Sequence, residues 1–484
     1  MIAVGVLVRV NRFRGAVFVM SWVVRELIGA ELGDVRLNDR LIRIVEAIAQ
    51  QPEAGIPQAC GKAGSKATYR FFDNQRVQAG KILAAHAARA VERAARHQVV
   101  LAPQDTTTWS LAHHPGTQGL GTVGSVKKPQ GLLVHSTMLL DGEGTPLGVL
   151  DQQVWARSPK HFGSRRKARQ KPVQQKESQC WLNSLAAVQQ ALPEHPQVVV
   201  IGDRESDLFD LFAMPRRPGT DLLVRVGREG RCVDHDPKYL KQAVVQSPVR
   251  GTFEIEVPRA DERRARRAKV NVRWASLTVM PPRNHCQREQ LSPLPLQFVL
   301  IEETNAPRGQ KPLYWLLATT LSVESLEDAL RCVTWYTYRW RIERLHFVLK
   351  SGCKIEELQL ETAQRLKRAL ACYTIVAWKL LWLTYEARQN PDQSCARILS
   401  RSEWQSLHTT VHPKEPVSSE PPTMREAVRM IAQLGGFLAR KHDGEPGVKT
   451  LWRGLRRLHD ITLGWRRARA RQPRDPTLLH VGNA

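Results

Sequence analysis

The chain has 484 residues, of which 42% are hydrophobic and 6% aromatic. These proportions exclude a disordered chain and are typical of a folded protein with two or three domains. Lys and Arg number 72 against 46 Asp and Glu, so the formal charge is +26. This charge predicts a polyanionic partner, nucleic acid first. An anionic membrane surface fits less well, because the basic residues are spread along the chain.

The first residues, MIAVGVLVRVNRFRGAVFVMSWVV, are apolar, but Arg9, Arg12 and Arg14 interrupt them. The apolar runs are too short for a membrane span, and no small-residue cleavage site follows. We therefore interpret residues 1–20 as an N-terminal extension and expect a soluble, cytoplasmic protein without a membrane partner. The eight cysteines form no CxxC pair, which excludes a zinc knuckle. The loop GIPQACGK lacks the phosphate-loop spacing, so no nucleotide cofactor is expected.

The pattern of residues divides the rest of the chain into segments. Residues 21–95 carry leucines at helical spacing with basic residues between them, which predicts a helical DNA-binding domain. Over 96–388, short β-like runs such as VVLAPQDTTTW and PQVVVIG are followed by helical stretches, which predicts an α/β domain. More β-like runs over about 221–320 indicate a β-rich insertion. A stretch rich in Ser, Pro and Thr at 389–424 predicts a linker, and 425–484 a helical domain with a basic tail.

Two carboxylates follow apolar strands, Asp105 in PQDTTT and Asp203 in VVVIGDRESD. Strand ends of α/β sheets commonly present functional groups, although a single Asp there is more often a turn former or a helix cap. With Glu343 on a helix beside the strands, three carboxylates can converge on hard divalent cations. Two such ions can activate water or a 3′ hydroxyl for phosphodiester cleavage. Glu205 and Asp207 are alternative ligands, or carboxylates stabilised by a helix start.

The segment YTYRWRIERLHFVLK, residues 336–350, is predicted to be one helix. At about 100° per residue, Tyr336, Arg339, Glu343 and Lys350 share one side of it. A solvated surface helix is the plainer interpretation of such a pattern. Beside a metal centre, however, Arg339 and Lys350 would hold phosphate oxygens and Tyr336 could hydrogen-bond one.

Tyr336, Arg339, Glu343 and Lys350 match the Y-x2-R-x3-E-x6-K signature of bacterial DDE transposases, and the chain resembles their insertion-sequence-four family. PQDTTTWSL resembles the motif of the first aspartate and VVVIGDRESD that of the second, in the family's order. The likeness covers about residues 24 to 465. It implies an RNase H-like core in which Asp105, Asp203 and Glu343 bind two Mg²⁺ ions, with Mn²⁺ able to substitute. It also implies a bacterial, nucleoid-associated protein.

The same resemblance implies cut-and-paste transposition. Such an enzyme binds the terminal repeats of its element in double-stranded DNA, cleaves through a hairpin intermediate and joins the 3′ ends to target DNA. The C-terminal helices would pair two copies as a homodimer in the synaptic complex. Trp315 aligns with the family's base-stacking tryptophan, and Arg225 with a DNA-contacting arginine. From the residues alone, Trp315 is as readily a core residue of a strand and Arg225 a surface salt-bridge partner. Phe347 departs from the family resemblance, which implies a lysine at this position.

Two other functions fit the same residues. A metal-dependent DNA nuclease would cut DNA without joining it. The predicted N-terminal and C-terminal domains argue against this function, because a nuclease needs neither end recognition nor synapsis. A catalytically decayed repressor would occupy the ends without cleaving them, but the three acidic positions are intact. A transposase is therefore the favoured hypothesis.

Overall fold

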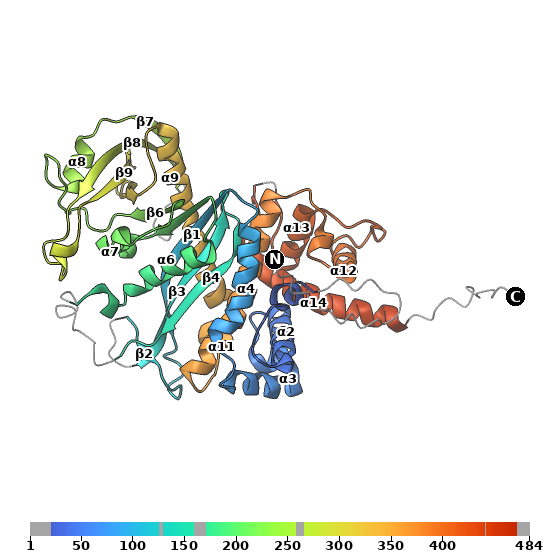
Figure 1. Cartoon of the computed structure of the whole chain (residues 1–484). Helices are drawn as coiled ribbons and strands as arrows, with labels where there is room; N and C mark the ends of the chain where they lie inside the picture. The colour runs from blue at the N-terminus through green and yellow to red at the C-terminus, as the bar shows by residue number, and fades with distance from the viewer. Residues whose placement is uncertain (1–20, 125–128, 159–170, 258–265, 441, 472–484) are drawn as a thin grey trace, which may run out of the picture.

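The computed structural model describes residues 21–124, 129–158, 171–257, 266–440 and 442–471. In these ranges a ten-stranded mixed sheet forms the centre of the molecule (Figure 1). The strand order in its first half is β4-β3-β1-β5-β6. Strand β3 runs antiparallel to β1, whereas β5 and β6 run parallel to β1. This is the strand order of the expected RNase H-like core. The strands are β1 (Val99–Ser110), β3 (Pro129–Asp141), β4 (Pro146–Trp155), β5 (Gln197–Gly202) and β6 (Thr220–Arg225), with the short β2 (Gly121–Thr122) beside β3.

The predicted β-rich insertion continues this sheet instead of forming a separate one. Strand β10 pairs antiparallel with β6, and β9, β8 and β7 follow in order. One face of this extension carries the short helix α8 (Leu240–Gln246). The strands are β7 (Gly251–Val257), β8 (Arg266–Val279), β9 (Leu294–Glu303) and β10 (Tyr314–Thr319). The catalytic core and the insertion therefore share one continuous sheet.

Helices cover both faces of the central strands, because alternate residues point to opposite sides of a strand. Leu101 and Ile201 belong to the core shared with α10 (Trp340–Phe347) and α11 (Ala363–Gln389), whereas Val100 and Val200 belong to the core shared with α6 (Gln179–Ala191) and α7 (Phe209–Ala213). Helix α9 (Leu326–Tyr338) packs beside β6 and β8 and leads into α10. The result is a three-layer α/β core.

The N-terminal segment is helical, as predicted. Its helices are α1 (Trp22–Leu27), α2 (Val35–Gln50), α3 (Ile56–Asp73) and α4 (Ala79–Ala94), and Ser21 and Asp34 cap the first two with their side chains. Helix α4, however, lies along β4 and α11, since its buried Ala90 and Ala94 allow close approach to the sheet. The last helix of the expected DNA-binding unit is thus packed as part of the catalytic core.

The prediction of a linker over 389–424 is wrong, because this stretch contains η7 (Cys395–Arg397) and α12 (Arg401–Val411). Ser400 and Glu403 form a reciprocal capping box at the start of α12, and Trp404 and Leu407 are buried. This helix packs with α13 (Met424–Leu434) and α14 (Val448–Arg471) around a third core. The polar composition of this segment does not indicate helix α12, because the few apolar residues of that helix all face the core.

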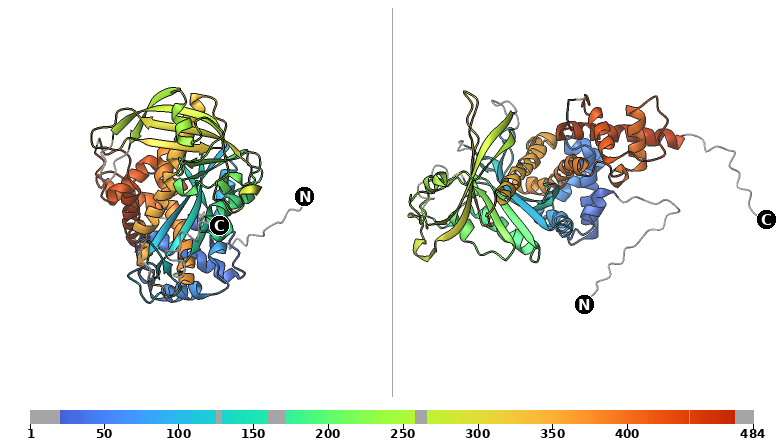
Figure 2. Two further views of the ribbon diagram at one scale, coloured as in Figure 1. Left: turned by 90° about the vertical axis from the view of Figure 1, so that its left-hand side faces the viewer. Right: turned by 90° about the horizontal axis from the view of Figure 1, so that it is seen from above.

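The N-terminal and C-terminal helices lie on the same side of the sheet, blue beside red in Figure 2. Helices α2 and α14 are in contact, and Arg456 of α14 forms an ion pair of 2.8 Å with Glu53. Within the described ranges no helix is both long and apolar enough to cross a membrane. All eight cysteines are free thiols. The predicted extension at 1–20 and the end of the basic tail, 472–484, lie outside the described residues.

Candidate active site

The register of β1 and β5 places Asp105 next to Asp203. These strands are parallel neighbours, and their last paired positions are Pro103 and Ile201. Two residues further along each strand come Asp105 and Asp203, on strands spaced about 4.8 Å apart. Both aspartates share the strand face of Leu101 and Ile201, which is the face that α10 covers. The two predicted carboxylates therefore lie side by side under the helix that carries Glu343.

The segment 336–350 is not the single regular helix that we expected. Helix α9 ends at Tyr338, α10 begins at Trp340, and a π-helical turn, Val348–Gly352, follows. Because a π-turn adds a residue to each turn, spacing at about 100° per residue does not hold as far as Lys350. No ion pair or hydrogen bond of Lys350 is found within the described part of the chain. The structure thus joins Tyr336, Arg339 and Glu343 by direct contacts, and it shows no such contact of Lys350 with them.

His346 anchors α10 to the sheet. It is buried, with its Nδ1 3.3 Å from Oδ2 of Asp105 and its Nε2 3.4 Å from Oγ of Ser136, the residue paired with Asp105 on β3. Glu343 precedes His346 by three residues and so lies on the same side of the helix. Sequence reasoning missed His346, although a histidine three residues after a candidate glutamate was a usable signal.

Glu343 is held by Arg339, whose Nη2 lies 2.6 Å from Oε1 of the carboxylate. The Arg339 residue is only 6% exposed, and its Nε and Nη1 have no hydrogen-bond partner among the residues that the structure describes. Burial works against the charge of this guanidinium, but the neighbouring Tyr336, Glu343 and Asp105 together raise its pKa. A buried cation with two unused donors is prepared to bind an oxyanion.

The electrostatics of Asp203 fit a carboxylate that awaits a cation. Burial raises its pKa, and the nearby charge of Asp105 adds to the rise, although the Glu205 N–H and Arg339 oppose it. Its side chain also accepts the backbone N–H of Glu205 at 2.8 Å, so it caps the turn after β5. Burial and then Asp203 likewise raise the pKa of Glu205. Two carboxylates that repel each other at a strand end are typical of a functional site.

Glu205 is exposed beside this pair, whereas Asp207 is buried and serves the fold. Oδ2 of Asp207 accepts the backbone N–H groups of Gly227 at 2.8 Å and Arg228 at 2.9 Å, and Oδ1 pairs with Arg231. Asp207 is thereby committed to the loop after β6, which leaves Asp203 and Glu205 as the carboxylates of this motif that could bind a metal ion.

No three His, Cys, Asp or Glu side chains in the described ranges lie close enough together to coordinate one metal ion as they stand. Glu343 is turned to Arg339 instead. The donor set nevertheless suits a hard divalent cation, since it consists of carboxylate oxygens and includes a pair under mutual repulsion.

Two predicted DNA-binding residues lie beside Tyr336. The ring of Trp315 on β10 meets that of Tyr336 edge to face at 5.4 Å. Arg225 on β6 interacts with the Tyr336 phenol and donates to the Tyr314 carbonyl oxygen at 3.1 Å. Burial raises the pKa of Tyr336, while Arg339 and Arg225 act to lower it. Arg225, Trp315, Tyr336 and Arg339, here called the arginine–aromatic cluster, therefore form one group next to the carboxylates.

Trp340 is a further residue that sequence reasoning missed. It follows Arg339 directly, is 50% exposed, and has the guanidinium of Arg339 5.3 Å from its ring. A large aromatic residue exposed beside an anion-binding arginine suits contact with a nucleic-acid base. Its position within the family signature, between Arg339 and Glu343, was the feature of the sequence that could have indicated it.

Three family models match the chain. They are Transposase DNA-binding over residues 19–77, Transposase DDE domain over 171–378 and Transposase Tn5 dimerisation domain over 375–473. The DDE match includes Asp203 and Glu343, whereas Asp105 precedes it and is placed at the site by the sheet register. These matches show a DNA-binding, divalent-metal-dependent enzyme that cleaves and transfers DNA strands and forms dimers. The chain therefore belongs to the DDE transposases, and within them to the Tn5-like members of the insertion-sequence-four family.

Proposed function

We propose that this DNA transposase uses Asp105, Asp203 and Glu343 to hold two Mg²⁺ ions, with Mn²⁺ able to substitute. The observation that carries the proposal is the register that sets Asp105 beside Asp203 beneath α10. When bound, the metal supplies activation of water or a 3′ hydroxyl and charge stabilisation in phosphodiester cleavage. Asp105 and Asp203 would bind it from the sheet, and Glu343 would join them by leaving Arg339.

The arginine–aromatic cluster would position the DNA end. Release of Glu343 frees the third guanidinium nitrogen of Arg339, in addition to the two that have no partner among the described residues. Arg339 could then hold phosphate oxygens with a planar fork of donors. Arg225 and the Tyr336 hydroxyl lie close enough to share the same phosphate group. Lys350 would contribute from the π-turn if DNA binding moves that turn. The exchange of Glu343 between Arg339 and the metal couples DNA binding to assembly of the site.

Hairpin formation needs a terminus with a base out of its stack, and two tryptophans are available for it. Trp315 is partly buried against Tyr336, and Trp340 is exposed on the next helix. We assign base stacking to Trp315, with Trp340 beside it. The reaction would proceed by a first nick, attack of the 3′ hydroxyl on the opposite strand, hairpin opening and joining to target DNA.

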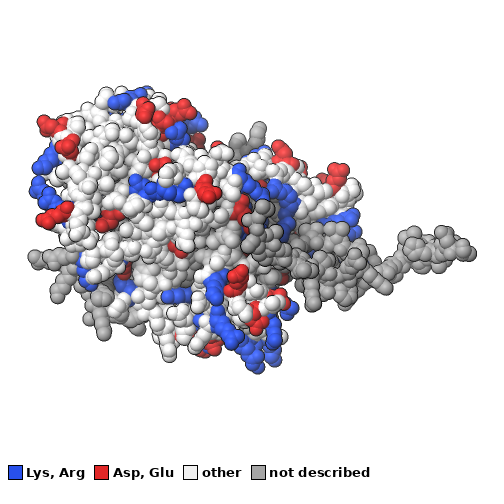
Figure 3. Space-filling view, viewed as in Figure 1, with Lys and Arg blue, Asp and Glu red and all other residues white. Residues whose placement is uncertain are grey.

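The N-terminal helices supply a surface for the terminal repeats. Figure 3 shows basic side chains gathered near the lower edge of the molecule, where α2 and α3 lie. The exposed basic residues of these helices include Arg36, Arg43, Lys62, Lys66 and Arg70. Such a surface neutralises backbone phosphates and makes binding depend on salt. The helices α12 to α14 would pair two copies on two DNA ends.

The test is a labelled duplex that carries the terminal repeat and flanking DNA, incubated with full-length protein and separated on a denaturing gel. With Mg²⁺ or Mn²⁺ we expect a nick followed by a hairpin. Trp315→Ala should keep the nick and lose most of the hairpin, while the neighbouring Tyr314→Phe should keep both. Opened ends without a hairpin intermediate in the wild type would overturn the hairpin pathway.

A further inference from the structure

A cavity of about 490 Å³ lies between α1, α4 and α11, with η7 at its rim, away from the active-site carboxylates. It occupies the junction of the N-terminal helices, the catalytic core and the C-terminal helices. Three tryptophans line it together with two carboxylates and six basic side chains. The basic residues are Arg25, Arg89, Arg93, Arg96, Lys379 and Arg397.

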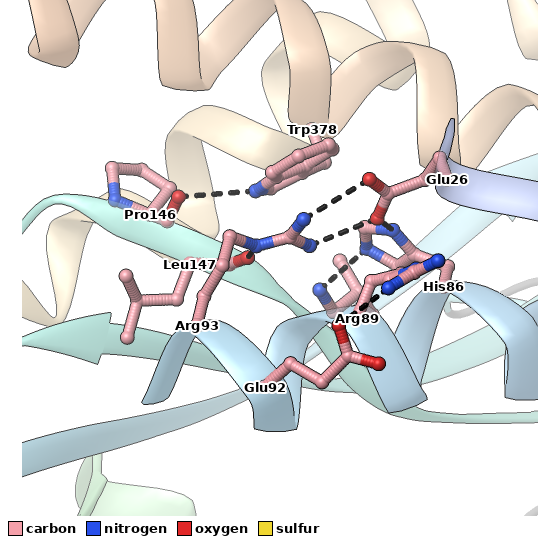
Figure 4. A network of polar contacts seen from close by, with 9 residues as sticks. Glu26, His86, Arg89, Glu92, Arg93, Pro146, Leu147 and Trp378 are labelled. Carbon is pink, nitrogen blue, oxygen red and sulfur yellow. Dashed lines mark hydrogen bonds and ion pairs between the residues drawn. The ribbon is translucent and has the colours of Figure 1, made fainter. Parts of the chain in front are cut away.

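Both carboxylates of the cavity are already paired. Glu26 accepts Nη1 and Nη2 of Arg93 at 3.0 and 2.8 Å and Nδ1 of His86 at 2.6 Å (Figure 4). The Nε2 of His86 accepts the backbone N–H of Val149 at 2.9 Å, so the ring proton sits on Nδ1 and points at Glu26. Glu92 pairs with Arg89 at 2.5 Å. The four other cations of the cavity gain no counter-ion from these two acids.

Lys379 is the most confined of these four cations. Its Nζ lies 3.6 Å from the ring centroid of Trp382 and 5.6 Å from that of Trp22. No carboxylate lies within ion-pair distance of it in the part of the chain that the structure describes. Aromatic faces stabilise a cation but do not neutralise it. Arg96, one turn beyond Glu92, likewise has no acidic partner in the described ranges, and the nearest acid to Arg397 is Glu386 at 3.6 Å.

We propose that this cavity binds an oxyanion of the phosphate class. Its volume exceeds that of one phosphate. Within the described ranges three of its cations have no ion-pair partner: Arg25 on α1, Arg96 two residues after α4, and Lys379 on α11. Arg397 of η7 lies at the rim and is paired with Glu386. Charge-assisted hydrogen bonds to phosphate oxygens would satisfy them together. The anion can be free phosphate or a phosphodiester of the DNA backbone. In either case it ties α1 to α11 and η7.

The binding should depend on pH. Burial lowers the pKa of Lys379 to about 7; Glu26 and Glu386 act to raise it, whereas Arg25 and Arg93 act to lower it. A bound anion favours the charged ammonium, so binding takes up a proton where Lys379 is partly neutral. For an anion whose own charge does not change in this range, such as a phosphodiester, the affinity should therefore be higher at pH 6 than at pH 8.

In the experiment, full-length protein is titrated with inorganic phosphate and with pyrophosphate at constant ionic strength, and calorimetry measures the heat of binding. Repeating the titration in buffers with different ionisation enthalpies gives the number of protons taken up. We expect saturable binding, with more protons taken up near pH 7 by the wild type than by Lys379→Met, because the ionisation of phosphate itself is common to both. Lys379→Met, which keeps the apolar stem, and the exposed Arg96→Gln should each weaken binding at least about fivefold, as for loss of one charge-assisted hydrogen bond. Lys238→Met, an exposed lysine of the insertion, should bind as wild type.

A second arm uses duplex DNA carrying the terminal repeat. If phosphate fails to bind but Lys379→Met and Arg96→Gln each lower the salt dependence of DNA binding by about one counter-ion, the cavity takes a backbone phosphate. If both variants bind phosphate as tightly as the wild type, or if neither ligand responds to them, the proposed site is overturned. Loss of cleavage activity is not the readout, so this result is separate from the roles assigned to the metal site.

Discussion

Two arginine–glutamate pairs in this transposase have similar distances and different surroundings. Arg93 lies 2.8 Å from Glu26, and Arg339 lies 2.6 Å from Glu343. The first pair is fully used, since Glu26 also accepts His86 and Arg93 also donates to the Leu147 carbonyl oxygen at 2.6 Å. In the second pair, two nitrogens of Arg339 have no hydrogen-bond partner in the described part of the chain. A satisfied pair fixes the fold, whereas an unsatisfied one keeps donors for a ligand.

The pKa values of the carboxylates also differ between these two regions. Burial acts to raise the pKa of Glu26, but hydrogen bonds and charges of His86 and Arg93 outweigh it and lower the value to about 2. At Asp203, burial and Asp105 act in the same direction and the pKa rises. Glu26 thus has its counter-charge in a direct ion pair, while Asp203 forms no ion pair within the described ranges and feels only the charge of Arg339 nearby. This difference distinguishes a structural carboxylate from one prepared for a cation.

The largest expected effect is at the unsatisfied pair. Glu343→Gln should lower the rate of DNA cleavage by about 10³-fold or more, because the amide keeps the shape but not the charge needed by a divalent cation. End binding, measured by fluorescence anisotropy, should stay within about twofold, since phosphate contacts dominate affinity. A comparable loss of binding and cleavage would contradict the assignment of Glu343 to metal chemistry.

The next effect is on stability at the satisfied pair. Glu26→Gln should lower the free energy of unfolding by about 3–5 kcal/mol, because it leaves Arg93 without its buried counter-charge. The matched control is Glu92→Gln on the cavity rim, whose pair with Arg89 is exposed and should contribute less than about 1 kcal/mol. Urea unfolding of both variants measures the difference. Equal losses would remove the distinction between the two pairs.

The stabilisation by Glu26 should also depend on pH. Its pKa falls from 4.5 in the unfolded chain to about 2 in the fold, a difference equivalent to about 3 kcal/mol. Because the folded value is the lower one, this contribution is complete above about pH 4.5 and is lost as the pH falls through the folded pKa. The difference in unfolding free energy between wild type and Glu26→Gln should therefore shrink from pH 6 to pH 3. A constant difference would argue against the shift.

The smallest effect is expected at Phe347, where the family resemblance leads us to expect a lysine. The ring of Phe347 lies 5.9 Å from that of Trp452 on α14, so this position supports the docking of the C-terminal helices. Phe347→Lys should cost about 1 kcal/mol of unfolding free energy through the lost aromatic contact. It should also add about one counter-ion to the salt dependence of DNA binding. An unchanged salt dependence would mean that this position does not face the DNA.

The sequence predicts Asp105 and Asp203 as site residues because each follows a run of apolar residues that can be recognised from its immediate neighbours in the sequence. Their adjacency could not be derived that way, since it depends on the register of β1 and β5. The same limit applies to α4, whose helical spacing was evident but whose packing on β4 was not. The break at Arg339 and the π-turn at Val348–Gly352 have no local signal such as proline, so a regular helix was assumed. The capping box of Ser400 and Glu403 is visible in the sequence as a serine followed three residues later by a glutamate, and it predicts a helix start within the segment that we expected to be a linker.

The central claim is that Asp105 and Asp203 form the catalytic carboxylate pair. The most direct measurement compares Asp203→Asn with Glu205→Gln, two residues along, on labelled terminal-repeat DNA with Mg²⁺ on a denaturing gel. We expect Asp203→Asn to bind the DNA and yield neither nick nor hairpin, and Glu205→Gln to retain both products. Cleavage by Asp203→Asn at the wild-type rate, or equal loss in Glu205→Gln, would contradict the account.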